Sequence, residues 1–180
     1  IHAVEQVMHN IKVLLKPGAL LCDLCSVKEE PCRLMLRNAP KHVHILGTHP
    51  LFGPQSAARG LKGHRIVLCP VRITDVSPIQ HWCQEKGLKV IIATPQEHDK
   101  QMAQTQVLGQ LMGRIVQSFD MQDRPLDDPS FRLLQQLHAM TKDDDEQLFW
   151  DIQKHNIYAK DTQQKLYKAV EEIMARLPSR

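Results

Sequence analysis

The sequence predicts an α/β unit over residues 1–95, followed by an all-α unit over residues 96–180. Two observations predict this division. In the first part, short apolar runs of strand length alternate with helical patterns, which is typical of parallel β-α-β packing. In the second part, apolar residues recur at three- and four-residue steps, as they do on helices that face a core. A chain of 180 residues is long enough for two such units.

Four apolar runs are the predicted strands of the first unit. They occupy residues 19–24, 42–46, 65–69 and 88–93. We expect Pro70 to limit the third strand, because proline cannot donate a ladder hydrogen bond. Residues 47–63 are rich in glycine and proline, so a loop is expected there.

Helical patterns separate these strands. Residues 4–15 carry apolar residues at helical spacing until Lys16-Pro17-Gly18 stops the pattern, and a partly helical stretch runs to about Asn38. Ser77 followed by Pro78 predicts a helix start, and Gly87 its end. Strand, helix and strand in this order predict parallel packing.

The second unit is predicted to begin at a capping box, in which the side chains of Thr94 and Glu97 each accept a hydrogen bond from the backbone N–H of the other residue. A long helix follows, and its buried stripe is expected to contain Val107, Leu108, Leu111, Met112, Ile115, Val116 and Phe119. Two more helices open at acidic residues 127–128 and 143–146, and the last carries apolar residues over 166–174. The acidic run at 143–146 could be proposed as a cation site, but capping and solvation explain it without a ligand.

Composition excludes several classes of protein. The net charge is only +3, and no one-sided basic stripe is present, so we expect no nucleic-acid partner. No run of eighteen apolar residues could span a bilayer, so no membrane association is expected. The chain begins without a secretory pattern, and its five cysteines are an odd number, which together predict reduced thiols in the cytoplasm.

One cysteine pair has the spacing of a metal or redox site. Cys22 and Cys25 are separated by two residues, but no second pair follows at zinc-site spacing. A redox motif should open a helix, whereas Cys22 lies in a predicted strand. We therefore expect ordinary buried thiols and no metal.

The most informative segment is GTHPLFGP at residues 47–54, directly after a predicted strand. Strand ends in a parallel sheet face the ligand crevice, and a rigidly held imidazole at His49 could accept or polarise a proton near neutral pH. A turn with a merely exposed histidine is the alternative.

Two further segments contain polar groups near expected element boundaries. Ser26 and Lys28 follow the first strand, where they could line the same crevice or serve only as a helix cap and a solvent-exposed charge. Residues 97–99 read EHD at the start of the long helix. The alternative there is a pair of acids that favour the helix dipole around an exposed histidine.

Taken in order, these segments resemble the prephenate dehydrogenase family, most closely the type that is fused to chorismate mutase. Residues 23–28 resemble its Asp-x-x-Ser-Val-Lys segment, and residues 47–54 its Gly-x-His-Pro-Met-Phe-Gly-Pro loop, with leucine for methionine. Residues 97–99, 129–132 and 145–152 match three further segments. The resemblance implies the later half of a Rossmann-type dinucleotide-binding domain, followed by a helical domain through which such enzymes form homodimers.

The resemblance also implies a reaction, the oxidative decarboxylation of prephenate to 4-hydroxyphenylpyruvate with NAD or NADP in tyrosine biosynthesis. His49 would accept the proton of the substrate hydroxyl, and Ser26 would orient His49 or touch the substrate and cofactor. Arogenate is an alternative substrate that undergoes the same aromatisation.

Binding roles follow from the same resemblance. Lys28, Arg132 and His98 would contact the substrate, whose carboxylates need cationic partners. Pro50 would lie beside the cofactor. A family arginine falls on Met140, so Lys142 could substitute, the alignment could slip there, or substrate binding could be weakened or altered.

No G-x-G-x-x-G motif occurs in the chain. The resemblance places that phosphate-binding turn before Ile1, so we expect this chain alone to bind dinucleotide poorly and to be inactive. A non-catalytic homologue that binds a metabolite or mediates dimerisation remains an alternative.

Overall fold

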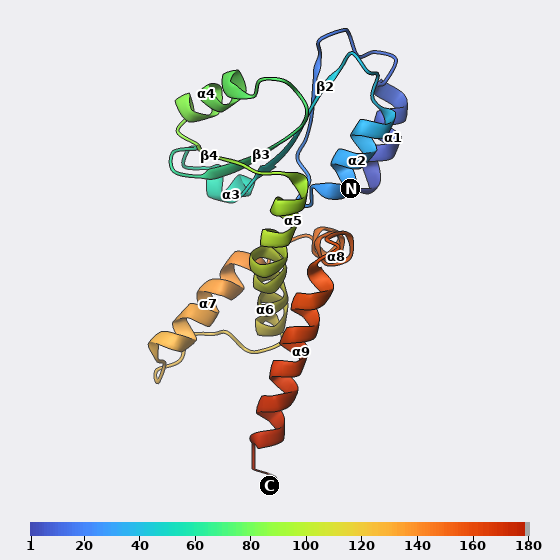
Figure 1. Cartoon of the computed structure of the whole chain (residues 1–180). Helices are drawn as coiled ribbons and strands as arrows, with labels where there is room; N and C mark the ends of the chain where they lie inside the picture. Colours follow the sequence, from blue (N-terminus) through green and yellow to red (C-terminus); the bar gives the residue numbers. More distant parts are fainter. Residues whose placement is uncertain (179–180) are drawn as a thin grey trace. The chain divides into compact units, whose positions relative to one another are not determined.

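The computed structural model describes residues 1–178, and the chain forms two compact units, Ile1–Lys100 and Gln101–Arg180 (Figure 1). The first unit contains a four-stranded sheet with helices on it. The described part of the second unit is helical. The predicted order of an α/β unit followed by an all-α unit is therefore confirmed.

The first unit alternates strands and helices along the chain. Its strands are β1 (Leu20–Asp23), β2 (His44–Pro50), β3 (Arg65–Arg72) and β4 (Lys89–Ile92). Its helices are α1 (His2–Ile11), α2 (Glu29–Asn38), α3 (Pro54–Ala57) and α4 (Ser77–Glu85), and α5 (Pro95–Met102) begins at its end.

The sheet is mixed, with strand order β1-β2-β3-β4, rather than wholly parallel as we expected. β1 pairs parallel with β2, and β3 pairs parallel with β4, each across a helix, but β2 and β3 are antiparallel. A strand of seven residues such as β2 spans roughly 23 Å. The four-residue helix α3 between β2 and β3 is only about 6 Å long. The connection therefore contains no helix that could return the chain to the other end of the sheet.

β3 continues past Pro70, contrary to the prediction that this proline would limit it. Pro70 lies opposite Leu46, next to a shift of register between Ile45 and Leu46. Such an irregularity accommodates a residue that lacks an N–H donor. β3 thereby reaches Arg72, whose guanidinium donates to the carbonyl oxygen of Val43 at 2.8 Å.

Separate hydrophobic clusters cover the two faces of the sheet. One joins α1 and α2 to β2 and contains Met8, Cys32, Met35, Ala39 and Ile45. The other joins α4 to β2 and β3 and contains Leu46, Ile66, Leu68, Cys83 and Leu88. Because successive residues of a strand point to opposite faces, neighbouring Ile45 and Leu46 belong to different clusters.

The predicted helix boundaries are partly confirmed. α1 ends at Ile11 rather than near residue 15, and Leu14, which the predicted pattern included, is exposed. α4 begins at Ser77 with Val76 as its N-cap, and Gly87 follows its end with φ +84°. That left-handed backbone is one that glycine adopts without strain.

The capping box before α5 is confirmed. The Glu97 carboxylate accepts hydrogen bonds from the backbone N–H of Thr94 at 2.9 Å and from its hydroxyl at 2.8 Å. The Thr94 hydroxyl in turn accepts the backbone N–H of Glu97 at 3.1 Å. These bonds lower the pKa of the Glu97 carboxyl. They also fix the start of α5 at Pro95, three residues before His98 and four before Asp99.

The described part of the helical unit contains a broken helix and three further helices. Its elements are the five-residue π-helix Ala103–Val107 (labelled η1), α6 (Leu108–Gln117), α7 (Pro129–Thr141), α8 (Glu146–His155) and α9 (Ala159–Arg176). A π-turn frees carbonyl oxygens from the regular ladder. The oxygen of Ala103 accepts from the Thr162 hydroxyl at 2.9 Å, and that of Val107 from the Gln153 amide at 3.2 Å.

The acidic segments cap helices as predicted. The side chain of Asp128 accepts the N–H of Phe131 at the start of α7, and that of Asp145 accepts the N–H of Leu148 at the start of α8. Within residues 1–178, no group of three or more His, Cys, Asp or Glu side chains could hold a metal ion. Among the same residues, no helix is both long and apolar enough to cross a membrane.

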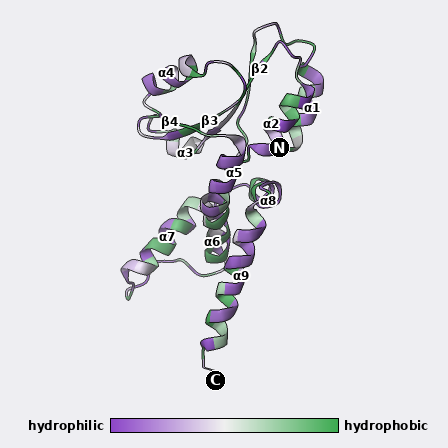
Figure 2. Ribbon diagram, in the orientation of Figure 1, coloured by the Kyte–Doolittle hydropathy of each residue, from purple (hydrophilic) through white to green (hydrophobic). Residues whose placement is uncertain are grey.

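The expected buried stripe after residue 104 is only partly buried. Of its residues, Val107 and Val116 are buried, whereas Ile115 and Phe119 are exposed. Val107 packs in a core cluster with Ile152 of α8 and Ala159 of α9. Hydrophobic residues also recur between hydrophilic ones along α7 and α9 (Figure 2). Those exposed on α9 are Tyr167, Val170, Ile173 and Met174.

Candidate functional site

His49 is the starting point of the candidate site, and it lies inside a strand. The prediction placed it in a loop after residue 46, but β2 extends through Pro50, and His49 is paired with Val67 of β3. The antiparallel partner supplies ladder bonds that outweigh the low strand propensity of glycine and proline. The side chain is only 4% exposed, so the alternative of an exposed turn histidine is wrong.

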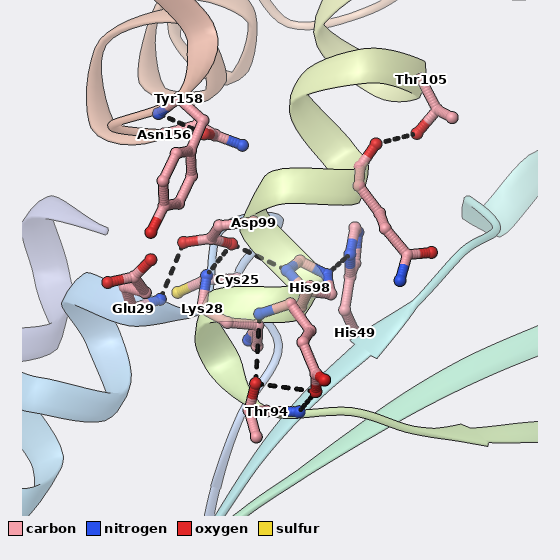
Figure 3. Close-up of polar contacts among 12 residues, drawn as sticks. Cys25, Lys28, Glu29, His49, Thr94, His98, Asp99, Thr105, Asn156 and Tyr158 are labelled. Atoms are coloured by element: carbon pink, nitrogen blue, oxygen red, sulfur yellow. Dashed lines mark hydrogen bonds and ion pairs between the residues drawn. The ribbon is translucent and has the colours of Figure 1, made fainter.

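A chain of three buried side chains runs from His49 into α5 (Figure 3). Nδ1 of His49 lies 2.8 Å from Nε2 of His98, and Nδ1 of His98 lies 2.7 Å from Oδ1 of Asp99. The rings of the two histidines meet edge to face, with centroids 5.1 Å apart. His98 and Asp99 are buried as well, which excludes the alternative that His98 is exposed at the helix start.

The Asp99 carboxylate also holds the start of α2. Its Oδ1 accepts the backbone N–H of Lys28 at 2.7 Å, and its Oδ2 accepts that of Glu29 at 2.9 Å. Lys28 is the N-cap residue of α2. An anion on the first N–H groups of a helix is the usual solution for donors that have no partner within the helix. The alternative that Ser26 caps this helix is therefore wrong, because the cap is the side chain of Asp99, 71 positions after Lys28 in the sequence.

Lys28 is fully buried rather than a solvent-exposed charge. Its ammonium forms an ion pair with Asp23 and donates to the carbonyl oxygen of Thr48 at 2.7 Å. Asp23 also accepts the backbone N–H of Thr48 at 3.2 Å and that of Cys25 at 2.9 Å. These bonds join the end of β1, the segment before α2 and the residue that precedes His49.

Gly47 makes room for this ion pair. A Cβ atom at this position would lie 2.6 Å from Sγ of Cys32, 3.2 Å from Cβ of Cys69 and 3.3 Å from Cδ of Lys28. Those distances are shorter than normal van der Waals contacts. A side chain at this position would therefore displace Cys32 first, and it would also crowd Cys69 and the Lys28 side chain that forms the ion pair.

Burial sets the protonation state of His49. It lowers the pKa of His49 from 6.5 to about 3, with smaller contributions from His98 and Lys28. The imidazole is therefore neutral throughout the physiological range. Within residues 1–178 its only hydrogen bond is the one at Nδ1, which leaves Nε2 available for a ligand.

The cysteines around this site are not activated. Burial raises the pKa of Cys69 to about 12 and also raises the pKa of Cys32. All five thiols are unpaired, but Cys22 is exposed and Cys25 partly exposed, so the expectation that all five would be buried is wrong for these two. Cys22 lies in β1 as expected for a thiol outside a redox motif.

Ser26 and Pro50 lie at the ends of neighbouring strands. Ser26 is three residues beyond the end of β1, and Pro50 is the last residue of β2, with both side chains partly exposed. β1 and β2 are parallel, so their carboxyl ends lie at the same edge of the sheet. This places Ser26 and Pro50 at the edge where His49 is found.

Arg132 belongs to the helical unit. Its guanidinium forms two hydrogen bonds with the Asp127 carboxylate, at 2.7 and 2.9 Å, and this pairing raises the pKa of Arg132. Met140, which occupies the expected position of a family arginine, is 78% exposed, and Lys142 is the C-cap residue of the same helix.

Sequence reasoning missed three residues of the site. Asp99, Asp23 and Thr48 were part of the quoted segments but received no role. The acid directly after His98 was a usable signal for Asp99. The roles of Asp23 and Thr48 depend on the pairing of β1 with β2, which brings residues 25 positions apart into contact.

The fit of a dinucleotide can be tested at the start of α2, the described helix that follows β1. The N–H groups of Lys28 and Glu29 are already bonded to Asp99, so they do not fit a pyrophosphate. The partly exposed hydroxyl of Ser26 and the available Nε2 of His49 instead fit the reacting end of such a ligand.

Comparison with known proteins identifies relatives of this chain. Residues 1–92 match the model of the prephenate dehydrogenase nucleotide-binding domain, and residues 115–180 match that of the TYRAAT1-like C-terminal domain. Arogenate dehydrogenase 2, chloroplastic, of Arabidopsis thaliana is 30% identical over 170 residues, covering 91% of this chain and 48% of the relative. The T-protein of Enterobacter agglomerans is 35% identical over 115 residues, covering 60% of this chain and 28% of the relative.

A solved structure shares the fold. Prephenate dehydrogenase from A. aeolicus, determined with hydroxyphenyl propionate and NAD+, aligns with a TM-score of 0.69 and 17% identity, covering 97% of this chain and 66% of that one. This chain thus spans about half of the plant relative and less than a third of the T-protein. The family model covers just over half of the 180 residues, including β1, β2 and His49. The chain belongs to the prephenate dehydrogenase family.

Proposed function

We propose that this chain is part of an NAD(P)-dependent dehydrogenase that oxidatively decarboxylates prephenate to 4-hydroxyphenylpyruvate, with His49 as the proton acceptor. The observation that carries the proposal is the environment of His49, which lies on a strand of the matched nucleotide-binding domain. Its buried, neutral imidazole is held by His98, and His98 in turn is held by Asp99. A neutral imidazole with one ring nitrogen held and the other available is suited to general-base chemistry.

The proposed reaction moves one hydride and releases one carbon dioxide. The ring carbon that carries the hydroxyl loses its hydride, and a bound nicotinamide would accept it. The bond to the ring carboxylate breaks, and its electron pair completes the aromatic ring. His49 accepts the hydroxyl proton while the hydride leaves and returns it as the phenol forms, so protons and electrons balance.

The low pKa of His49 defines how it acts. An imidazole with a pKa of about 3 is not protonated before the substrate binds, so it can accept the hydrogen bond of the hydroxyl at any physiological pH. Full proton transfer becomes favourable only as the hydride leaves, because the hydroxyl then becomes much more acidic. The strongest interaction is thus made in the transition state, where it accelerates the reaction.

The binding roles are assigned around this base. We place Ser26 and Pro50 beside the reacting end of the cofactor, because both lie at the strand ends near His49. Lys28 and His98 are buried and engaged, which supports positioning roles rather than direct substrate contact. Arg132 remains the proposed carboxylate ligand and would have to exchange Asp127 for the substrate.

Arogenate is the second candidate substrate. The observation that favours it is the 30% identity to a plant arogenate dehydrogenase across 91% of this chain. Arogenate carries an amino group where prephenate carries a keto group, and the reacting ring is the same. His49 would therefore perform the same step on either substrate.

One experiment tests the proposal and separates the substrates. The full-length gene product is incubated with prephenate or arogenate and with NAD+ or NADP+, and the reduced cofactor is followed by its absorbance. We expect turnover with prephenate that exceeds turnover with arogenate. Higher kcat/KM with arogenate would assign the plant-type activity, and no turnover in any combination would support a non-catalytic homologue instead.

We further propose that the helical unit forms a homodimer and that the protein is located in the cytoplasm. Exposed Tyr167, Val170, Ile173 and Met174 recur at helical spacing on α9, which supports an interface between two copies. Five unpaired cysteines favour a reducing compartment. Light scattering that reports a monomer at micromolar concentration would contradict the dimer.

A further inference from the structure

His98 is a bridge with one partner on each ring nitrogen. Its Nδ1 lies 2.7 Å from Oδ1 of Asp99, and its Nε2 lies 2.8 Å from Nδ1 of His49. Its side chain is buried, so water does not compete for either nitrogen. In such a chain, the proton position on each ring is dictated by the neighbouring group.

The order of donors and acceptors can be followed from Asp99. An ionised carboxylate only accepts hydrogen bonds, and Asp99 already accepts two backbone N–H groups. Nδ1 of His98 must therefore carry the proton that it donates to Asp99. If His98 is neutral, its Nε2 then has a lone pair, and Nδ1 of His49 must donate to it. Nε2 of His49 is consequently left without a proton.

We propose that Asp99 and His98 are positioning residues that fix His49 in the Nδ1–H tautomer, so that Nε2 is its basic atom. The tautomer itself follows from the hydrogen bonds, and its catalytic consequence rests on the proposed function. Neither residue is required to touch the substrate. His98 is thereby moved from the substrate-binding group expected from the sequence to the set of residues that orient the base.

The competing arrangement is a doubly protonated His98. It would donate to both neighbours, so Nδ1 of His49 would become an acceptor and Nε2 would carry the proton. Two features favour the neutral form. A buried imidazolium carries a large desolvation penalty, and Asp99 already receives two backbone donors that offset its charge.

The same carboxylate connects the tautomer to the fold. Asp99 accepts hydrogen bonds from the first N–H groups of α2, which include that of Lys28. The ammonium of Lys28 pairs with Asp23 and donates to the carbonyl oxygen of Thr48, the residue before His49. The backbone and the ring of His49 are therefore positioned by one connected set of bonds. A change at Asp99 should alter the proton position on His49 even where the strand is intact.

The direct test is the proton position on each histidine ring. The 180-residue chain is labelled with 15N-histidine, and long-range 1H–15N correlations are recorded at pH 8. His49→Gln, His98→Gln and the exposed His81→Gln assign the signals. We expect His49 and His98 both to be protonated at Nδ1 only. Protonation of His49 at Nε2, or of both nitrogens of His98, would overturn the proposal.

Two variants extend the test. An asparagine in Asp99→Asn can turn its amide group toward His98, which would move the protons and leave His49 protonated at Nε2. In His98→Gln, the side-chain carbonyl can still accept from Nδ1 of His49, so the tautomer should persist. Circular dichroism verifies that both variants are folded. An unchanged His49 tautomer in folded Asp99→Asn would contradict the relay.

Turnover gives an independent readout in the full-length gene product. In a serine protease, the analogous aspartate-to-asparagine change leaves the geometry intact and lowers kcat by about 10⁴-fold. We expect Asp99→Asn to lower kcat by at least ~10²-fold with little change in KM. His98→Gln, which keeps an acceptor for Nδ1 of His49, should lower kcat less than Asp99→Asn does. If no substrate is turned over but His49 shows the Nδ1–H tautomer, the proposed function fails and the relay stands. Turnover with the opposite tautomer refutes the relay alone.

Discussion

The backbone N–H of Lys28 donates to the carboxylate of Asp99 at 2.7 Å, although 71 positions separate them in the chain. Asp99, which lies on α5, thus caps the start of α2, and the same carboxylate accepts a hydrogen bond from His98. A substitution at Asp99 therefore alters both the cap of α2 and the support of the histidine pair.

Replacing Asp99 with alanine should destabilise the first unit strongly. The change leaves two backbone donors of α2 and Nδ1 of His98 without their buried acceptor, which we expect to cost about 2–4 kcal/mol in the free energy of unfolding. Urea denaturation measures it. Asp75→Ala is the matched control, because exposed Asp75 accepts the N–H of Ser77 at the start of α4. A loss in Asp99→Ala no larger than in this control would contradict the assignment.

Lys28→Met should destabilise the first unit, because it removes one partner of the buried ion pair with Asp23. Removing the ammonium leaves the Asp23 carboxylate uncompensated in the interior, and such changes cost about 3–5 kcal/mol. Arg33→Met removes the cation of an exposed pair with Glu30 and should change little. Thermal unfolding of both variants provides the comparison. Equal melting temperatures would show that Lys28 is not buried as described.

Two glycines of α6 should respond in opposite directions to alanine. A Cβ at Gly113 would lie 2.6–2.9 Å from three side-chain atoms of Thr141 on α7, so Gly113→Ala should destabilise the helical unit by about 1–3 kcal/mol. No atom lies within 4 Å of a Cβ at Gly109. Gly109→Ala should therefore stabilise the unit by about 0.5 kcal/mol, through lower chain entropy in the unfolded state. Chemical denaturation that ranks the two variants in the reverse order would contradict this packing.

Stability should fall with acidification because His49 is buried in its neutral form. Its folded pKa, about 3, lies below the ordinary value of 6.5, so the unfolded chain binds one more proton between these limits. The stabilisation is fully present above pH 6.5 and is lost progressively as the pH falls toward 3. His49→Gln should show a shallower dependence than the parent chain over this window. Parallel pH profiles for the two proteins would contradict the lowered pKa.

Local patterns in the sequence predicted the elements of the fold well. The capping box at Thr94 and Glu97, the glycine after α4 and the acidic caps of α7 and α8 depend on neighbours within a few residues. The predicted role of His49 came from the family resemblance of its segment. The patterns could not show that β2 and β3 are antiparallel. Whether two strands pair parallel or antiparallel depends on the path of the segment that connects them.

The hydrogen bonds and the ion pair of the site could not be predicted from the sequence for the same reason. Lys28 and Ser26 were both plausible surface residues, and only the packing of α2 against the strands shows that one is buried and the other is not a cap. Asp99 was part of a quoted segment, but its bonds to Lys28 and Glu29 join residues about 70 positions apart. Such contacts require the tertiary structure.

The most direct test of the central claim is the rate of reduced cofactor formation by the full-length gene product with His49→Asn, beside exposed His81→Asn as the matched control. General-base groups contribute typically 10²–10⁴-fold to the rate. We predict that kcat with prephenate falls by at least ~10²-fold in folded His49→Asn and is unchanged in His81→Asn. Turnover that is equal in both variants would show that His49 is not the proton acceptor.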